Sequence, residues 1–337
     1  MGVEGAYCDE CGTLMMRFSS QSPLEKTLQQ MFVREMESCG RASVHYKALA
    51  AVQSKPCWCD GLDAEVRFNP ARVRSVMAEV DAESLRHRAC FLCPSGLEKN
   101  QQTTDWQSPL QVGEAGHYCL RVNPYPIFEE HYTFSAARHE RQEILPHMDD
   151  MFLLCSALPH YTLFYNGPSC GASAPDHFHF QAIPFGVLPL QRMCERGEGL
   201  HLLHATIDWR MYRVERYVGS AYWIVGKTWE TVREQFEQLY EKAPQRADEW
   251  EPRMNIIAWY RDEAEEYAVL VILRSESRPL CFFAADEEQI LISPACVEMT
   301  GVAIVADERS FQRLTPERLE RIIKEVSLPR EQIDGLL

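Results

Sequence analysis

Two histidines and a glutamine at alternating positions are the residues of this sequence with the clearest chemical potential. The stretch from Asn166 to Gln181 reads N-G-P-S-C-G-A-S-A-P-D-H-F-H-F-Q and ends in His177, His179 and Gln181. In an extended strand successive side chains point to opposite faces, so these three polar side chains share one face. An unprotonated imidazole can attack phosphorus and form a covalent intermediate, which divides one displacement into two. The pattern therefore predicts a site that holds and attacks a phosphate.

A small-residue loop precedes this strand and supplies groups that can surround an anion. Glycines let backbone amides approach a phosphate closely, and further donors are needed at the non-bridging oxygens, where charge develops during the attack. The candidate donors are the backbone amides of Gly167, Gly171 and Ala172 and the hydroxyls of Ser169 and Ser173. Alone, a histidine pair is commonly a surface or core feature and a glycine-serine segment a turn, but together with Gln181 they favour a functional site.

The charge of the chain limits the classes of ligand. With 34 Lys and Arg against 49 Asp and Glu, the formal net charge is -15. Nucleic acid and anionic membranes require clustered positive charge, so we expect no general affinity for either. An anionic substrate therefore needs a local basic site. Arg274 and Arg278 are candidates, because a guanidinium group can form bidentate hydrogen bonds to phosphate oxygens. Both residues also follow an apolar strand, where loops commonly build binding sites.

The composition predicts an ordinary globular protein. Of the 337 residues 46% are hydrophobic and 25% are charged, and no apolar run approaches the length that spans a bilayer. The N-terminus lacks a basic segment followed by a hydrophobic one, so we expect a cytoplasmic protein that does not bind membranes. The 13 cysteines are spread over a long chain, unlike the dense framework of a small secreted domain, and we expect them to be mostly reduced.

Hydrophobic periodicity indicates which elements position these residues. Residues 20–54 carry apolar side chains at helical spacing, and farther on strands and helices alternate at short spacing, which predicts an α+β domain. We expect strands at 64–68, 117–122, 131–134, 161–165, 177–183, 254–260, 267–273, 290–292 and 302–305, and helices at 142–157, 229–242 and 316–326. The polar segment 96–113 is expected to be an exposed loop.

We expect two regions in the chain, a largely helical N-terminal extension over residues 1–87 and a main domain over residues 88–337. Within the main domain, the expected strands at 118–122 and 131–134 form a pair. The expected strands at 255–260 and 268–273 form a similar pair farther along the chain. This similarity predicts two related half-domains, at about 88–200 and 201–337.

The run G-A-S-A-P-D-H-F-H-F-Q resembles the active-site strand of the histidine-triad superfamily, in the branch that carries H-x-H-x-Q. That branch includes galactose-1-phosphate uridylyltransferase, diadenosine tetraphosphate phosphorylase and the GDP-hexose phosphorylases. The resemblance implies an antiparallel sheet with helices. It implies that His179 is the nucleophile that becomes nucleotidylated, that Gln181 hydrogen-bonds the phosphoryl oxygens and that His177 positions the site. It also places Asn166 in the phosphate loop.

Other segments extend the resemblance over about residues 88–306. The run V-N-P-Y-P-I-F-E-E-H is similar to the N-x-x-P passage that opens the nucleotide-binding sheet of the phosphorylases, which makes Asn123 a candidate substrate-binding residue. One departure lies directly before the first histidine. The family commonly has proline there, whereas here Asp176 intervenes after Pro175.

Three pairs of cysteines are close in sequence: Cys8 with Cys11, Cys57 with Cys59, and Cys90 with Cys93. The two-residue gap between Cys90 and Cys93 lets both thiolates reach one tetrahedral metal ion. In the uridylyltransferases a similarly placed pair joins two histidines to bind zinc, and the resemblance implies His139 and His177 in those positions. Two thiolates and two imidazoles suit a structural zinc site. The alternatives are buried free thiols, or a separate site that includes Cys8 and Cys11.

Together these features predict a nucleotidyltransferase of the phosphorylase type. We expect His179 to attack the α-phosphorus of a nucleoside diphosphate sugar or a dinucleoside polyphosphate, and inorganic phosphate to accept the nucleotidyl group. One alternative is a hexose-1-phosphate uridylyltransferase, in which a sugar phosphate is the acceptor and which the zinc set favours. The other is a non-catalytic protein that binds nucleotide or zinc. No organic cofactor is expected.

Overall fold

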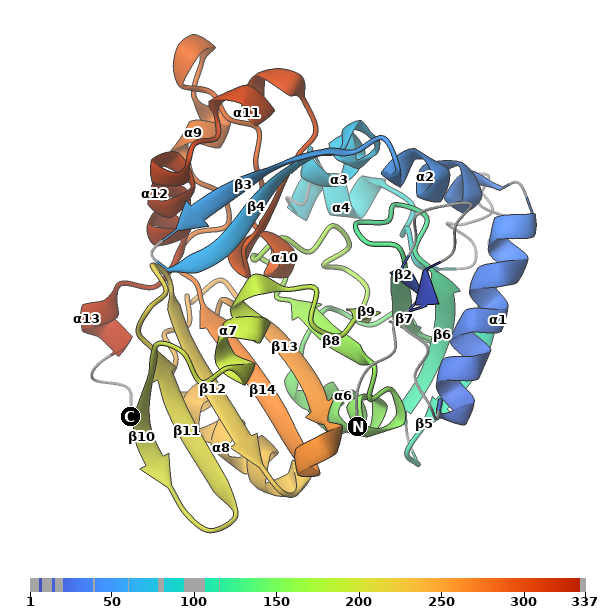
Figure 1. Ribbon diagram of the computed structural model, residues 1–337, viewed down its shortest axis with the longest axis vertical. Coiled ribbons are helices and arrows are strands. Elements are labelled where there is room, and N and C mark those ends of the chain that lie inside the picture. Colours follow the sequence, from blue (N-terminus) through green and yellow to red (C-terminus); the bar gives the residue numbers. More distant parts are fainter. Residues whose placement is uncertain are drawn as a thin grey trace.

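A ten-stranded antiparallel sheet forms the centre of the molecule, with helices around it and a three-stranded sheet beside it (Figure 1). The computed structural model describes residues 6–7, 14–15, 21–38, 40–59, 61–77, 82–93, 107–114 and 116–333. The arrangement confirms the predicted α+β class. Cys8 and Cys11 lie outside the described residues, as does most of the predicted loop at 96–113.

The order of the large sheet is β10-β11-β12-β14-β13-β8-β9-β7-β6-β5. Its first five strands in sequence are β5 (Gln107–Val112), β6 (Gly116–Val122), β7 (Tyr132–Ala136), β8 (Tyr161–Asn166) and β9 (His179–Pro184). The next five are β10 (Leu200–Ala205), β11 (Trp209–Val214), β12 (Ser220–Gly226), β13 (Met254–Arg261) and β14 (Glu266–Leu273).

The two halves of this sheet repeat one topology. Counted outward from the junction between β8 and β13, the first half runs β8, β9, β7, β6, β5 and the second runs β13, β14, β12, β11, β10. A helix precedes each junction strand, α6 (Met148–Ala157) before β8 and α8 (Trp229–Lys242) before β13. The repeat agrees with the predicted pair of related half-domains.

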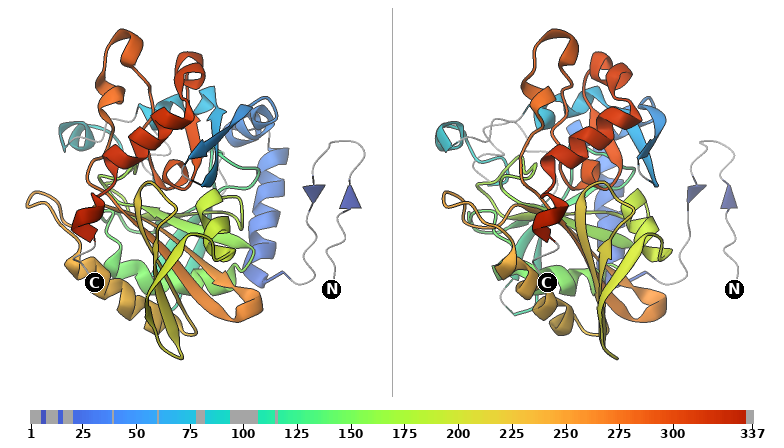
Figure 2. Two further views of the ribbon diagram at one scale, coloured as in Figure 1. Left: turned by 60° about the vertical axis from the view of Figure 1, so that its left-hand side comes forward. Right: turned by 90° about the vertical axis from the view of Figure 1, so that its left-hand side faces the viewer.

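Both faces of the large sheet bury apolar side chains. On one face lie α6 and α8, with α1 (Pro23–Glu37) and α2 (Arg41–Leu49) beside the first half. On the other lie α7 (Pro189–Glu195), α10 (Cys296–Met299), α12 (Pro316–Val326) and the three-stranded sheet (Figure 2). Because both faces are covered, the central strands read as continuous apolar runs rather than alternating ones.

The three-stranded sheet joins distant parts of the chain. β3 (Gln53–Cys59) and β4 (Leu62–Phe68) form a hairpin, and β15 (Val302–Val305) pairs with β4 in parallel. The predicted N-terminal extension therefore contributes two strands to a sheet that the C-terminal part completes. The shorter elements are η1 (Pro70–Arg72), α3 (Val73–Val76), α4 (Ala82–His87), η2 (Leu145–His147), η3 (Asp262–Ala264), α9 (Leu280–Phe283), η4 (Asp286–Glu288), α11 (Glu308–Arg313) and α13 (Arg330–Ile333), with a separate pair β1 (Ala6–Tyr7) and β2 (Leu14–Met15).

Several predicted elements differ from the structure, among them the strand predicted at 177–183, which begins only at His179, so that His177 lies in a bend before it. The predicted helix at 142–157 begins only at Met148, because the backbone amide of Gln142 bonds Pro175 and that of Ile144 bonds the Glu251 carboxylate. Residues 290–292 form no strand, and residues 107–112 of the predicted loop form β5. In contrast, α8, β15 and α12 begin and end where the sequence predicted.

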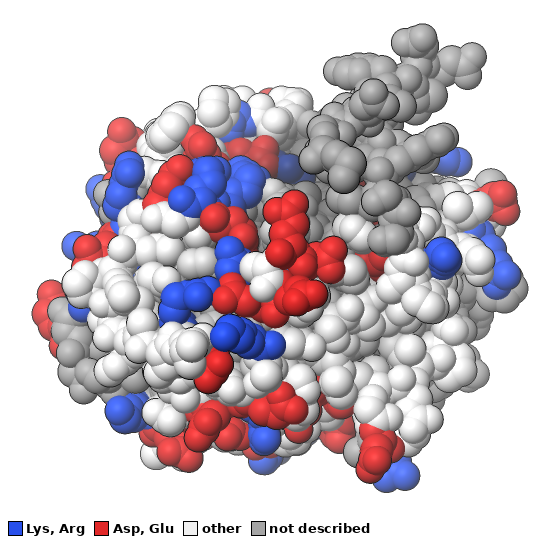
Figure 3. Space-filling view, turned by 60° about the horizontal axis from the view of Figure 1, so that its bottom comes forward, with Lys and Arg blue, Asp and Glu red and all other residues white. Residues whose placement is uncertain are grey.

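Charged side chains of both signs occur on the surface. On the face drawn in Figure 3, Lys and Arg are interspersed with Asp and Glu rather than gathered into one basic area. Within the described ranges, no helix combines the length and the apolar composition that a membrane crossing requires.

Candidate active site

His179 is the first residue of β9 and is almost completely buried. Its Nδ1 lies 2.9 Å from the backbone oxygen of His177, so Nδ1 carries the proton and Nε2 is left as an acceptor. Burial lowers the pKa of this imidazole to about 4, because surroundings of low polarity disfavour the charged form. His179 also lines a cavity beside the large sheet. It is therefore a neutral imidazole whose unprotonated nitrogen is available to attack.

The carboxamide of Gln181 is oriented by two neighbours. Its Oε1 accepts a hydrogen bond from His131 Nε2 at 2.8 Å and from Asn123 Nδ2 at 3.5 Å. Burial, and then the charge of Arg72, lower the pKa of His131 to about 3, so its ring is neutral with the proton on Nε2. With Oε1 occupied, the Nε2 of Gln181 is the group left to donate into the cavity that Gln181 lines. The sequence pattern had assigned no role to His131.

Asn166, at the end of β8, is oriented in a similar way. Its Oδ1 accepts hydrogen bonds from the backbone amide of Cys296 at 2.8 Å and from Asn255 Nδ2 at 2.9 Å. The Cys296 amide can only donate, so the oxygen of Asn166 must face it and the Nδ2 is left as a donor. Asn166 lines the same cavity. Two side-chain amides, from Asn166 and Gln181, thus present N–H donors beside His179.

The prediction that Arg274 binds phosphate directly is corrected by its contacts. The guanidinium is buried and donates to Asn255 Oδ1 at 2.6 Å. Its other N–H groups bond the backbone oxygens of Glu276, Ser277, Pro294 and Val326. Arg274 therefore supports Asn166 through Asn255 instead of contacting a ligand. Its position at a strand end suggested the site, but only the fold shows that its donors are already used.

Only some of the predicted phosphate-binding residues in the loop before His177 line the cavity. Gly171 and Ser173 line it, whereas Gly167 donates its amide to the oxygen of Met254 at 3.1 Å, and neither Gly167 nor Ser169 is among the lining residues. Gly171 has φ +91°, and a Cβ there would lie 2.4 Å from the Cβ of Ala295. The loop thus approaches its neighbour too closely for any residue but glycine.

The cavity measures about 220 Å³ and contains basic residues that the sequence did not identify. Arg41 from α2, Arg72 from η1 and Arg121 from β6 line it, together with Asn123. Among the described residues that line it, Glu298 is the one carboxylate, and burial raises its pKa. Three guanidinium groups against one carboxylate favour an anionic ligand. No local pattern marks these arginines, because they come from three separate elements.

Arg278, the other arginine predicted to bind phosphate, lies behind the cavity wall. It donates to Ser293 Oγ and to the backbone oxygen of Val76, each at 3.1 Å. Both of those residues line the cavity, but Arg278 itself does not. Its observed contacts therefore hold the wall in place.

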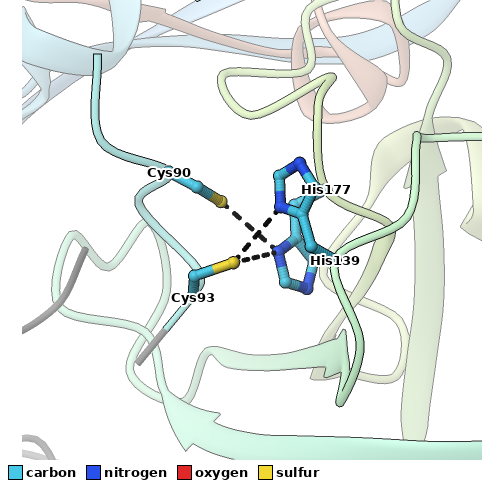
Figure 4. A group of neighbouring side chains, drawn as sticks. All are labelled: Cys90, Cys93, His139 and His177. Atoms are coloured by element: carbon cyan, nitrogen blue, oxygen red, sulfur yellow. Dashed lines mark hydrogen bonds between the residues drawn. The ribbon is translucent and has the colours of Figure 1, made fainter. Parts of the chain in front are cut away.

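Cys90, Cys93, His139 and His177 come together, with one ligand atom from each lying within 4.8 Å of the others. The Cys93 Sγ is 3.2 Å from His139 Nδ1 and 3.4 Å from His177 Nδ1, and the Cys90 Sγ is 3.3 Å from His177 Nδ1 (Figure 4). His177 Nε2 donates to the backbone oxygen of Ala136 at 2.8 Å, which leaves Nδ1 as the ligand atom. Two sulfurs and two imidazole nitrogens at this spacing can hold a metal ion.

Asp176, the residue inserted before His177, connects this cluster to the cavity wall. It forms an ion pair with Arg88 at 2.5 Å, and the Arg88 guanidinium lies 4.1 Å from the ring centre of Phe91. Phe91 lies between the two cysteines of the cluster and lines the cavity. The departure from the family pattern therefore has a structural use, because it fastens the loop before His177 to the loop at residues 88–93.

Comparisons with known proteins place the fold. Residues 31–184 match a family described as "Domain of unknown function (DUF4922)". A search of curated proteins gives no match. Among solved structures, yeast Ap4A phosphorylase Apa2 in complex with Ap4A aligns with a TM-score of 0.59 at 15% identity, over 92% of this chain and 98% of that one. Its complex with AMP aligns with a TM-score of 0.58 at 16% identity, over 92% and 97%.

At this level of identity the likeness concerns the fold. The chain has the histidine-triad-like α+β fold that the sequence predicted, with two half-sheets of one topology. Yeast Ap4A phosphorylase Apa2 shares this fold with the chain over nearly the whole length of both.

Proposed function

We propose that this protein is a nucleotidyltransferase that forms a covalent nucleotidyl intermediate on His179. One observation carries the proposal: Nδ1 of the buried imidazole donates to His177 O at 2.9 Å, which leaves Nε2 unprotonated in a cavity lined by three arginines. This is the tautomer that a histidine nucleophile requires. A protein that only binds nucleotides has no chemical need for it.

The reaction follows from these groups in two displacements. In the first, the lone pair of His179 Nε2 forms a bond to the α-phosphorus, and the bond to the leaving phosphate oxygen breaks with its electron pair. In the second, an oxygen of the acceptor attacks the same phosphorus, and the N–P bond breaks to restore the neutral imidazole. The Nε2 of Gln181 and the Nδ2 of Asn166 donate to the non-bridging oxygens, where charge develops in each step.

The preferred reaction is phosphorolysis of a dinucleoside polyphosphate or a nucleoside diphosphate sugar, with inorganic phosphate as the acceptor. Two observations support this choice, the fold shared with yeast Ap4A phosphorylase Apa2 and the arginines around the cavity. A hexose-1-phosphate nucleotidyltransferase, similar to the uridylyltransferases, is the second candidate. The Cys90, Cys93, His139 and His177 cluster favours it.

A panel of nucleotides tests activity, base and acceptor together. The protein is incubated with nucleotide sugars and with Ap4A labelled at the α-phosphate, in the presence of phosphate or hexose 1-phosphate. Release of a nucleoside diphosphate with phosphate indicates a phosphorylase, and transfer to the sugar phosphate indicates the alternative. Label bound to protein after rapid denaturation, absent in His179→Ala, identifies the intermediate. Binding of nucleotides without label transfer or turnover would favour the non-catalytic alternative.

We also propose that the Cys/His cluster holds a structural zinc ion. The donor set fits, since two thiolates and two imidazoles suit tetrahedral zinc closed to water. Zinc would supply no step of the reaction, but it would fasten residues 90–93 to the strand that carries His179. Metal analysis of freshly purified protein is expected to find zinc in wild type and to lose it in Cys90→Ser and Cys93→Ser. Absence of zinc in fresh wild-type protein would contradict this assignment.

A further inference from the structure

β8 and β9 pair over only part of their length. The ladder runs from Tyr161 opposite Pro184 to Phe164 opposite Gln181 and ends there. β8 continues to Asn166 and β9 begins at His179, so the ends nearest the cavity are not paired with each other. His179 pairs with Ser135 of β7 on its other side. The strands therefore separate at Asn166 and His179, which both line the cavity.

A side-chain amide lies in this gap. The backbone N–H of His179 donates to Gln142 Oε1 at 2.8 Å, and Gln142 Nε2 donates to His179 O at 3.1 Å. The same Nε2 donates to the backbone oxygen of Asn166, also at 3.1 Å. In an antiparallel ladder, one residue bonds its partner through both its N–H and its C=O. The carboxamide of Gln142 thus takes the place of the β8 residue that would otherwise face His179.

Gln142 is anchored by other segments. Its backbone N–H donates to Pro175 O at 3.1 Å, and its backbone oxygen accepts from Trp250 Nε1 at 2.7 Å. Its side chain is completely buried, and Gln142 is not among the residues that line the cavity. The backbone of Gln142 is therefore held by contacts outside β8 and β9, and its side chain is not part of the cavity lining.

We propose that Gln142 is a positioning residue that fixes the spacing between His179 and Asn166. Its carboxamide keeps the two strand ends apart by a defined distance, which sets the nucleophile relative to the donor for the phosphate oxygens. The inference rests on the proposed role of His179. A displacement of about 1 Å at a reacting group can lower a rate by about 100-fold, so the loss of this amide should appear in the chemical step.

The test compares two buried glutamines. Gln142→Met removes the amide between the strands. Gln191→Met is the matched control, because Gln191 is also completely buried and its amide bonds Thr162 Oγ1 and the amide of Gly186, outside the cavity. The rate of label transfer from α-labelled Ap4A to the protein is measured in single turnovers over a range of Ap4A concentrations. Hydrogen exchange of the backbone amide of His179 is followed in the same proteins.

We expect Gln142→Met to lower the saturating rate by about 100-fold while the Ap4A concentration for half-maximal rate changes by less than about threefold. The His179 amide should exchange faster in this variant, whereas Gln191→Met should leave both quantities unchanged. If Gln142→Met does not fold, Gln142→Glu keeps the acceptor for His179 N–H but loses the donor, and should show the same division between rate and apparent affinity.

A folded Gln142 variant that transfers label at the wild-type rate would overturn the inference. If wild-type protein takes no label, the proposed function fails and the exchange measurement decides the positioning by itself. Equal exchange of the His179 amide in wild type and Gln142→Met would then overturn it.

Discussion

β9 and β14 occupy matching places in the two half-sheets, yet one borders a cavity and the other does not. β14 pairs with β13 along all eight of its residues, and it also pairs with β12 on its other edge. β9 pairs with β8 at only four of its six residues. The cavity lies where this second ladder stops. One topology thus provides a closed framework in the second half and an opened ladder in the first.

The residues of the two strands explain the difference. β14 reads E-Y-A-V-L-V-I-L, and its apolar side chains are buried against helices on one face and α12 with its neighbours on the other. β9 carries His179 and Gln181, and at His179 its edge is bonded by the Gln142 amide instead of by β8. A complete ladder satisfies its own backbone and leaves no room for a ligand. An interrupted ladder leaves backbone N–H and C=O groups that need other hydrogen-bond partners, and it leaves space for a ligand beside those partners.

The largest expected effect is a loss of turnover from a substitution in β9, whereas a substitution in β14 should lower only stability. His179→Ala in β9 should lower turnover at least about a thousandfold, as loss of a nucleophile does, with little change in stability. Ile272→Val in β14, at a fully buried position, should lower the free energy of unfolding by about 1 kcal/mol and leave turnover unchanged. Turnover assays and urea titrations of both variants check this. Full activity in His179→Ala would remove the distinction between the strands.

A smaller effect concerns the loop that enters the opened half. Gly171→Ala places a Cβ 2.4 Å from that of Ala295, so the loop must move and turnover should fall by about 100-fold. Gly197→Ala is the control, because Gly197 also has positive φ, at +68°, but nothing lies within 4 Å of its Cβ position. Both variants should lose about 1 kcal/mol of stability from the backbone conformation alone. Equal turnover in the two variants would show that the contact with Ala295 does not set the loop.

The smallest effect is a pH dependence of stability in the first half. Burial holds the pKa of His131 at about 3, below its usual 6.5, so the unfolded chain binds this proton at a pH where the native protein does not. Stability must therefore fall as the pH decreases from 6.5 toward 3. His131→Gln keeps a donor for Gln181 but cannot titrate. Between pH 6.5 and 5 its unfolding free energy should fall by about 2 kcal/mol less than that of wild type. Parallel curves would contradict a neutral buried His131.

The fold could be predicted well where local patterns and tertiary packing agree. α8 has a threonine cap at Thr228 and apolar residues at helical spacing, and α12 has the same features after Thr315, so both were predicted with correct ends. The helix before β8 was predicted too long. Its first residues instead serve His179 and the Glu251 carboxylate, and such long-range bonds leave no periodic signal.

The active-site prediction divides in the same way. The H-x-H-x-Q strand and Cys90 with Cys93 are visible because their residues are adjacent in the chain. Arg72 and Arg121 line the cavity from distant elements, and Arg274 was assigned a ligand contact although its donors are used by Asn255 and backbone oxygens. A residue that contacts a ligand and a residue that positions such a residue look alike in a sequence, because residue type does not show which hydrogen-bond partners a side chain already has.

The sequence by itself determined that an extended run would place His177, His179 and Gln181 on one face, since alternation along a strand is a local property. Tertiary structure decided which partners each of these residues has. His177 Nδ1 meets two cysteines, His179 Nδ1 bonds a backbone oxygen so that Nε2 is free to act, and Gln181 is turned by His131. It also decided that the ladder opens at His179, because Gln142 comes from another segment to complete it. A tautomer, an amide orientation and a gap between strands all depend on partners far away in the chain, and only the folded molecule brings those partners together.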